Sequence, residues 1–180
     1  MNFSRKFLML VGLSSVAGAA LSSPYQTVSV YDGLRNQLLS LKPSDIGTPL
    51  AGNGKVLAVL METGYPKAVA TVVAVADGSA SIYFSNGGGI IGAGAHPQAR
   101  EKAVALIDLI SKNLSEFSKI STYPLPDNGL TRFYVVTADG IYSASAKEDD
   151  LGNRRSDLSP IFYVGQDLIT AIRLTSPNQK

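Results

Sequence analysis

The sequence predicts an α+β fold, in which a single antiparallel sheet of about five strands carries three packed helices in the order α-βββ-α-ββ-α. Two Asp-Gly pairs, Asp77-Gly78 and Asp139-Gly140, stand between short apolar segments, as hairpin turns do. Apolar residues recur at helical spacing in three other segments. Pro97 and Pro160 stand where two of those helices would begin, a position that suits proline.

The first helix is expected to begin at Ser29, whose hydroxyl can cap it together with Asp32 in a capping-box-like pair. Pro43 would end the helix, and residues 43–54, rich in Pro, Gly and Asn, are expected to form a loop. The apolar residues that recur at helical spacing are Tyr31, Leu34, Leu38 and Leu41.

Three strands should follow as an antiparallel meander. Residues 56–61 are continuously apolar, as expected of a strand covered on both faces, and residues 68–76 form a second apolar run rich in valine. Asp77-Gly78 is the preferred pair for a two-residue hairpin. Residues 80–85 alternate more clearly, which places three apolar side chains on one face: Ala80, Ile82 and Phe84.

The second half of the chain predicts a helix, a hairpin and a last helix. The middle helix begins at Pro97 and carries an amphipathic stripe made of Ala103, Ile107, Ile110, Leu114 and Phe117, with Val104 and Leu106 beside it. Residues 132–137 and 141–146 are the expected strands of the second hairpin, and residues 147–158 a charged loop. Ser159 would cap the last helix, whose inner face is formed by Phe162, Gly165, Leu168, Ile169 and Ile172.

In element order, this layout is similar to the roadblock and profilin-like group of small domains, with an additional third strand before the middle helix. The resemblance concerns layout alone and therefore implies no function. The expected organisation is one α+β domain at residues 29–176, preceded by a linker at 23–28 and followed by a tail at 177–180.

Residues 1–22 are expected to be a secretory signal peptide. Arg5 and Lys6 form a basic start, residues 7–20 are apolar or small, and Ala17-Gly18-Ala19 matches the pattern a signal peptidase accepts. The apolar run is shorter than the roughly 20 residues that span a bilayer. The expected location is therefore periplasmic or secreted, without membrane association after cleavage. The alternative is a cytoplasmic domain that begins near Ser29.

Composition excludes several classes of function. The 180-residue chain has 16 basic and 14 acidic residues, and the 14 basic residues left without Arg5 and Lys6 balance the acidic ones. Nucleic-acid binding usually leaves a basic footprint, so we expect none. The chain has no cysteine, which excludes disulfides, thiolate metal sites and cysteine nucleophiles. Its single histidine, His96, cannot form a two-histidine metal site, and no cofactor is expected.

The glycine-rich segment 86–94 is the most unusual feature. It follows an expected strand and precedes a helix, so its backbone amides could approach an anion. An antiparallel meander before it, a helix that starts later and the absence of a P-loop lysine all weaken a nucleotide interpretation. The structural alternative is a loop whose glycines permit positive φ. The candidate ligand-binding residues are Asn86, Gly87, Gly88, Gly89, Gly92, Gly94, His96 and Arg100.

No convergent acid, base and nucleophile set is apparent, so no catalytic residue is assigned and an enzyme is the less favoured interpretation. A polar interaction patch in the charged loop 147–158 is a further alternative. The sequence favours an exported, non-catalytic binding or interaction domain that contacts a protein partner or small ligand through residues 86–96. The alternative is a small-ligand, nucleotide or phosphate-binding domain, or an enzyme, that uses the same loop with His96 and Arg100. A homo-oligomer is left open.

Overall fold

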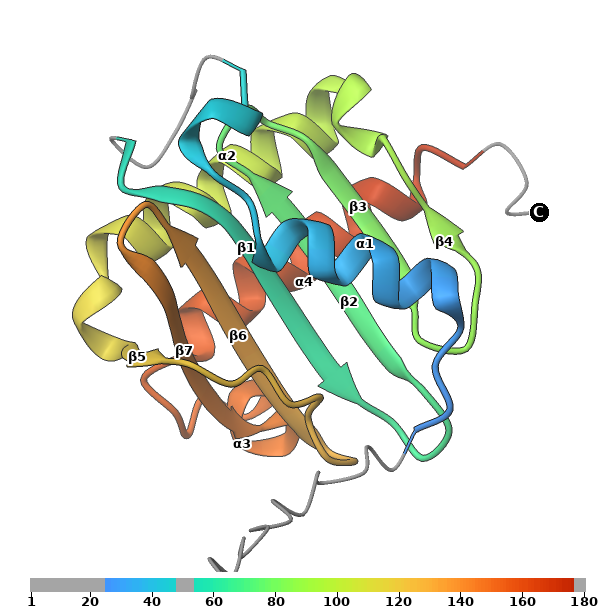
Figure 1. Cartoon of the computed structure of the whole chain (residues 1–180). Coiled ribbons are helices and arrows are strands. Elements are labelled where there is room, and N and C mark those ends of the chain that lie inside the picture. Colours follow the sequence, from blue (N-terminus) through green and yellow to red (C-terminus); the bar gives the residue numbers. More distant parts are fainter. Residues whose placement is uncertain (1–24, 48–53, 177–180) are drawn as a thin grey trace, which may run out of the picture.

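The computed structural model describes residues 25–47 and 54–176 (Figure 1). Within this part, seven strands form one antiparallel sheet in the order β4-β3-β2-β1-β6-β7-β5. Helix α1 crosses one face of the sheet, and α2 and α4 cover the other (Figure 1). The predicted α+β class with a single antiparallel sheet is confirmed. The expected signal peptide and C-terminal tail lie outside the described residues.

The first strands form the expected meander, with one addition. β1 is Val56–Gly64, β2 Val69–Val75 and β3 Ala80–Phe84. All nine residues of β1 are buried, because β1 is central in the sheet and helices lie over both faces. A short strand β4, Gly89–Ile90, pairs with β3 at the edge of the sheet. The sequence prediction of a plain loop over residues 86–94 was therefore wrong at these two residues.

The second group of strands also has an edge strand that the sequence did not indicate. β6 is Leu130–Thr137 and β7 Gly140–Lys147, and β6 pairs with β1. β5, Ser118–Ile120, pairs with β7 at the far edge. Three residues with mixed polarity carry no period-2 signal, which is why this strand escaped the sequence pattern.

Both hairpin turns lie at the Asp-Gly pairs, as predicted. In neither turn, however, do Asp and Gly form the two loop residues of a two-residue hairpin. The β2–β3 turn is a three-residue loop over Ala76–Gly78, in which Val75 pairs with Ser79 and Gly78 adopts a φ of 85°. In the β6–β7 turn Thr137 pairs with Gly140, so the loop residues are Ala138 and Asp139 and the glycine already belongs to β7.

Four α-helices lie in the described residues: α1 Ser29–Leu39, α2 Pro97–Lys112, α3 Glu148–Gly152 and α4 Ser159–Arg173. Short 3-10 turns follow or precede them at Pro43–Asp45, Ala93–Ala95 and Leu114–Glu116. α3 lies inside the segment predicted as a charged loop. Its first turn is Glu148-Asp149-Asp150, and acidic residues there interact favourably with the helix dipole.

The predicted serine caps were wrong. Ser29 and Ser159 are the first residues inside their helices, and the N-cap positions belong to Val28 and Leu158, with no side-chain cap hydrogen bond. Asp32 instead accepts a hydrogen bond from the Thr27 hydroxyl at 2.8 Å. Pro97 does occupy the start of α2, as predicted.

The core divides into two clusters, one on each face of the sheet. The larger cluster lies between the sheet and helices α2 and α4, and it contains Ala103, Ile107 and Ile110 of the predicted stripe and the adjacent Leu106, all fully buried. The prediction that Leu114 and Phe117 continue the stripe on the same helix was wrong, because α2 ends at Lys112, although both residues pack with this cluster. The smaller cluster lies beneath α1 and centres on Tyr31. None of the helices in the described ranges is long and apolar enough to cross a membrane.

Candidate functional site

The glycine-rich segment closes the hairpin between β3 and β4. The amide of Gly87 donates to the carbonyl of Phe84 at 2.9 Å, and the amide of Phe84 donates to the carbonyl of Gly88 at 3.1 Å. Gly87, Gly88 and Gly89 all adopt positive φ, with values of 105°, 81° and 149°. Side chains rarely adopt this conformation, so the turn itself accounts for the three consecutive glycines.

Two glycines of the segment also permit a close approach between backbones. A Cβ atom on Gly89 would lie 2.4 Å from the carbonyl oxygen of Ile82, and one on Gly94 would lie 2.4 Å from that of Gly78. Gly89 therefore lets β4 pack on β3, and Gly94 lets the following segment pack on the β2–β3 turn. These positions have a structural reason to be glycine whether or not a ligand binds.

The predicted polar partners of the loop do not converge on a common point. Arg100 donates from Nε to the carbonyl of Gly94 at 3.0 Å and from Nη1 to the carbonyl of Asp77 at 3.2 Å. Its guanidinium thus joins two turns of the protein. His96 is exposed at the N-cap of α2 and makes no side-chain cap bond, and Asn86 is exposed at the hairpin tip.

A hollow lies between α4 and the sheet, on the face of the sheet that α2 and α4 cover. We call it the sheet hollow; its volume is about 490 Å³. Its floor consists of two cross-strand rows, which follow from the register of β1 to β4. The inner row is Met61, Val72, Ile82 and Ile90, and the outer row is Thr63, Ala70 and Phe84.

The sheet hollow exists because a small side chain stands in the outer row. Ala70 lies between Thr63 and Phe84, and its methyl group leaves space that a larger residue would fill. α4 covers this space closely at one end, where a Cβ atom on Gly165 would lie 2.5 Å from the sulfur of Met61. Further along α4, three residues at helical spacing form the cover: Gln166, Ile169 and Arg173.

Two of the four polar side chains that line the sheet hollow, Thr63 and Tyr65, already have hydrogen-bond partners. The hydroxyls of Thr63 and Thr131 lie 2.9 Å apart, and the Tyr65 hydroxyl donates to Glu148 Oε1 at 3.0 Å. Partial burial, and then the charge of Glu148, raise the pKa of Tyr65 to about 12, so its phenol is neutral at physiological pH. Arg173 is exposed, and no acidic residue of the described chain forms an ion pair with it.

The predicted site residues overlap only slightly with this hollow. Gly89 lines it, whereas Gly87 and Gly88 line a smaller hollow of about 240 Å³ on the α1 side of the sheet, together with Gly89. Exposed apolar side chains border the smaller hollow, among them Val30 and Ile91. The remaining five predicted residues, Asn86, Gly92, Gly94, His96 and Arg100, line neither hollow.

The sequence pattern places Ile169 on the inner face of the last helix but does not single out Gln166 and Arg173. The helical spacing of these three residues indicates a shared face of the last helix, but nothing in the apolar run 68–76 indicates that Ala70 leaves space beside it.

Over residues 25–47 and 54–176, no group of three or more His, Asp or Glu side chains could hold a metal ion. Comparison of the chain with protein-family models, curated proteins and solved structures finds no match.

Proposed function

We propose that this chain is a non-catalytic binding protein whose sheet hollow takes a small amphipathic anion, with the apolar part inside and the charged end at Arg173. The single observation that carries the proposal is the arrangement itself, an apolar hollow of about 490 Å³ with an arginine at its edge that forms no ion pair within the described residues. Ligand sites commonly have volumes of roughly 300–1,000 Å³, a mainly apolar lining and a few polar groups that orient the ligand.

The lining supplies both parts of the recognition. Met61, Val72 and Ile82 form an apolar floor, and burial of ligand surface there is favourable at roughly 25 cal/mol per Å². Arg173 presents a planar guanidinium that can bind a carboxylate through two parallel hydrogen bonds. Gln166, about two turns earlier on α4, adds an amide that can donate to or accept from the same polar end.

Catalysis is not part of this proposal. The polar groups in the lining are hydroxyls, one amide and one guanidinium, and the hydroxyl of Tyr65 stays protonated. None of these is a general base near neutral pH. If residues 1–22 act as a signal peptide, binding takes place in the periplasm or outside the cell.

Three decyl compounds with different head groups test the proposal: decanoate, decanol and decyltrimethylammonium, each below its micelle-forming concentration. A ligand that binds only the native state raises the melting temperature. We expect the largest rise with decanoate, a smaller one with decanol and none with the cation. Equal shifts for all three compounds would contradict the proposed role of Arg173.

Two variants locate the binding. Ala70→Leu fills the sheet hollow and should abolish the decanoate shift without lowering the melting temperature of the free protein. Arg173→Gln should reduce the decanoate shift to that of decanol. Lys112→Gln is the matched control, because Lys112 is also an exposed basic residue in the last turn of a helix. An unchanged decanoate shift in Ala70→Leu would overturn the proposal.

A further inference from the structure

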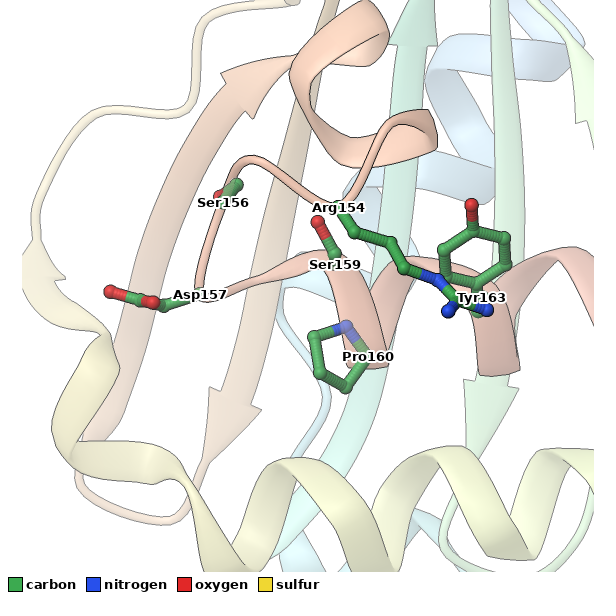
Figure 2. Close-up of a pocket in the computed structure, with 6 residues that line it drawn as sticks. All are labelled: Arg154, Ser156, Asp157, Ser159, Pro160 and Tyr163. Atoms are coloured by element: carbon green, nitrogen blue, oxygen red, sulfur yellow. The ribbon is translucent and has the colours of Figure 1, made fainter.

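The start of α4 lies beside a second hollow, which we call the α4 entry pocket. Its volume is about 500 Å³, and its lining comes from the loop between α3 and α4 and from the first turns of α4 (Figure 2). The lining residues are Arg154, Ser156, Asp157, Ser159, Pro160 and Tyr163. None of them lines the sheet hollow, so the two sites are separate.

Ser159 is the most unusual group in the α4 entry pocket. The residue is only 3% exposed, and its Oγ is buried without a hydrogen-bond partner among the residues that the structure describes. In Figure 2 this hydroxyl is turned toward the loop that carries Arg154 and Ser156. Buried hydroxyls nearly always have partners, because an unmade hydrogen bond costs stability.

Within the described residues, no acidic side chain forms an ion pair with Arg154, which therefore supplies a positive charge. Its neighbour Arg155 forms ion pairs with Asp149 and Asp150, whereas the Arg154 guanidinium lies over the ring of Tyr163, 5.3 Å from its centroid. The Tyr163 hydroxyl in turn donates to the carbonyl of Gly152, which fixes the ring. The one acidic residue of the lining, Asp157, points away from Arg154 in Figure 2.

The helix and a second hydroxyl complete an environment suited to an anion. α4 is 15 residues long, and its N-terminal end carries the positive pole of the helix dipole. Ser156 accepts a hydrogen bond from the amide of Leu158 at 3.2 Å, so its own hydroxyl proton is available to donate. Ser156 and Ser159 thus offer hydroxyl donors on one side of the pocket, and the flexible Arg154 side chain offers its guanidinium on the other side, over Tyr163 (Figure 2).

We propose that the α4 entry pocket binds a tetrahedral oxyanion, of the kind carried by phosphate and soluble phosphate monoesters. Arg154 provides the charge, the hydroxyls of Ser156 and Ser159 provide hydrogen bonds, and the start of α4 provides the dipole. Ser159 acquires its missing partner when the anion is bound. This binding is independent of the sheet hollow, so decanoate should not compete with it.

Titration of the isotope-labelled full chain with inorganic phosphate tests the site. Amide resonances of residues 154–159 and 161 should shift and saturate, while the same ionic strength of sodium chloride should leave them unchanged. Glycerol 3-phosphate should saturate the same resonances. Shifts that never saturate, or that chloride reproduces, would overturn the proposal.

Two variants, Arg154→Gln and Ser159→Ala, test the donors, and a third is their control. Arg154→Gln retains a Cβ at the positive φ of 57° and should weaken phosphate binding by about tenfold, the order expected for a hydrogen bond to a charged group. Arg155→Gln is the matched control and should leave the affinity within about twofold, because Arg155 is committed to its carboxylates.

Ser159→Ala separates a binding role from a structural one. It removes an unpartnered hydroxyl, so the melting temperature without phosphate should stay the same or rise, while phosphate affinity should fall by about tenfold. Unchanged affinity in both Arg154→Gln and Ser159→Ala would refute the assignment.

Discussion

Arg35 of α1 and Glu62 of β1 form a two-point ion pair in the interior of the protein. Arg35 Nε lies 2.7 Å from Glu62 Oε1, and Arg35 Nη2 lies 2.9 Å from Glu62 Oε2. Glu62 is completely buried, and Arg35 is 8% exposed. Arg35 also donates to the carbonyl of Tyr123 at 3.0 Å. The pair therefore connects α1, the centre of the sheet and the segment before β6.

We expect Arg35→Met to destabilise the protein by about 3–5 kcal/mol, because it leaves the Glu62 carboxylate buried without its partner. The double variant Arg35→Met/Glu62→Leu should recover most of this loss, since two apolar side chains of similar volume need no charge compensation. Urea unfolding measures both free energies. A single variant that loses less than about 1 kcal/mol would show that α1 is not held by this pair.

The free energy of unfolding of Arg35→Met should fall as pH rises. Burial raises the pKa of Glu62, and the hydrogen bonds and charge of Arg35 oppose that rise. Without Arg35 the pKa rises further, although Arg132 opposite Glu62 in β6 still opposes it. In this variant, Glu62 has a higher pKa in the folded state than in the unfolded state, so the folded state binds the proton more tightly. The variant is therefore most stable at low pH, and its free energy of unfolding falls as pH rises past the ordinary carboxyl pKa.

Urea unfolding of Arg35→Met at pH 5 and pH 8 measures whether its free energy of unfolding falls with rising pH. The free energy lost relative to the native protein should be greater at pH 8. Arg35→Met/Glu62→Gln serves as control, because it carries no titratable group at position 62 and its loss should therefore not grow between pH 5 and pH 8. A larger loss at pH 5 would contradict the argument.

A core prediction follows from the stripe on α2. Ile107 is fully buried between α2 and the sheet, as are Ile110 and Val59. Ile107→Ala should cost about 2–5 kcal/mol in the free energy of unfolding, through lost burial and the cavity left behind. A loss below about 0.5 kcal/mol would mean that the site collapses or that the stripe contributes little.

The sequence predicted those parts of the fold that long, periodic segments determine. The apolar run of residues 56–61 indicated a strand covered on both faces, and the stripe from Ala103 to Ile110 indicated how α2 packs; the structure agrees with both. β4 and β5 were missed, because strands of two and three residues are defined by their pairing partners and not by their own composition.

The candidate sites could be predicted only in part, because they depend on register and on charge partners. The space above Ala70 follows from its place in a cross-strand row beside Thr63 and Phe84, which no local pattern reveals. Likewise, Arg154 and Arg155 are adjacent in the sequence, and only the structure shows that Arg155 forms ion pairs with Asp149 and Asp150 while Arg154 lies over the ring of Tyr163.

The glycine turn yields a prediction that compares two neighbouring residues. A Cβ atom at Gly88 would meet nothing within 4 Å, so Gly88→Ala should cost about 1–2 kcal/mol through its positive φ alone. Gly89→Ala adds a clash with the β3 backbone and should cost about 2–5 kcal/mol. Thermal or urea unfolding of the two variants compares them directly. Equal losses would mean that β4 can move away from β3 without cost.

Tyr31 and Tyr83 give a final prediction, because their rings touch while their hydroxyls differ. The ring centroids lie 5.6 Å apart in an edge-on arrangement beneath α1. The Tyr31 hydroxyl lies 3.0 Å from the hydroxyl of Thr71, whereas the Tyr83 hydroxyl is buried with no partner in the described structure.

Tyr31→Phe should therefore cost about 1 kcal/mol, because it leaves Thr71 without this hydrogen bond. Tyr83→Phe keeps the same ring contact and removes only the unpaired hydroxyl, so the free energy of unfolding should stay the same or rise by up to about 1–2 kcal/mol. Urea unfolding at one pH measures both. A loss from Tyr83→Phe as large as that from Tyr31→Phe would show that the Tyr83 hydroxyl has a partner in solution, such as an ordered water.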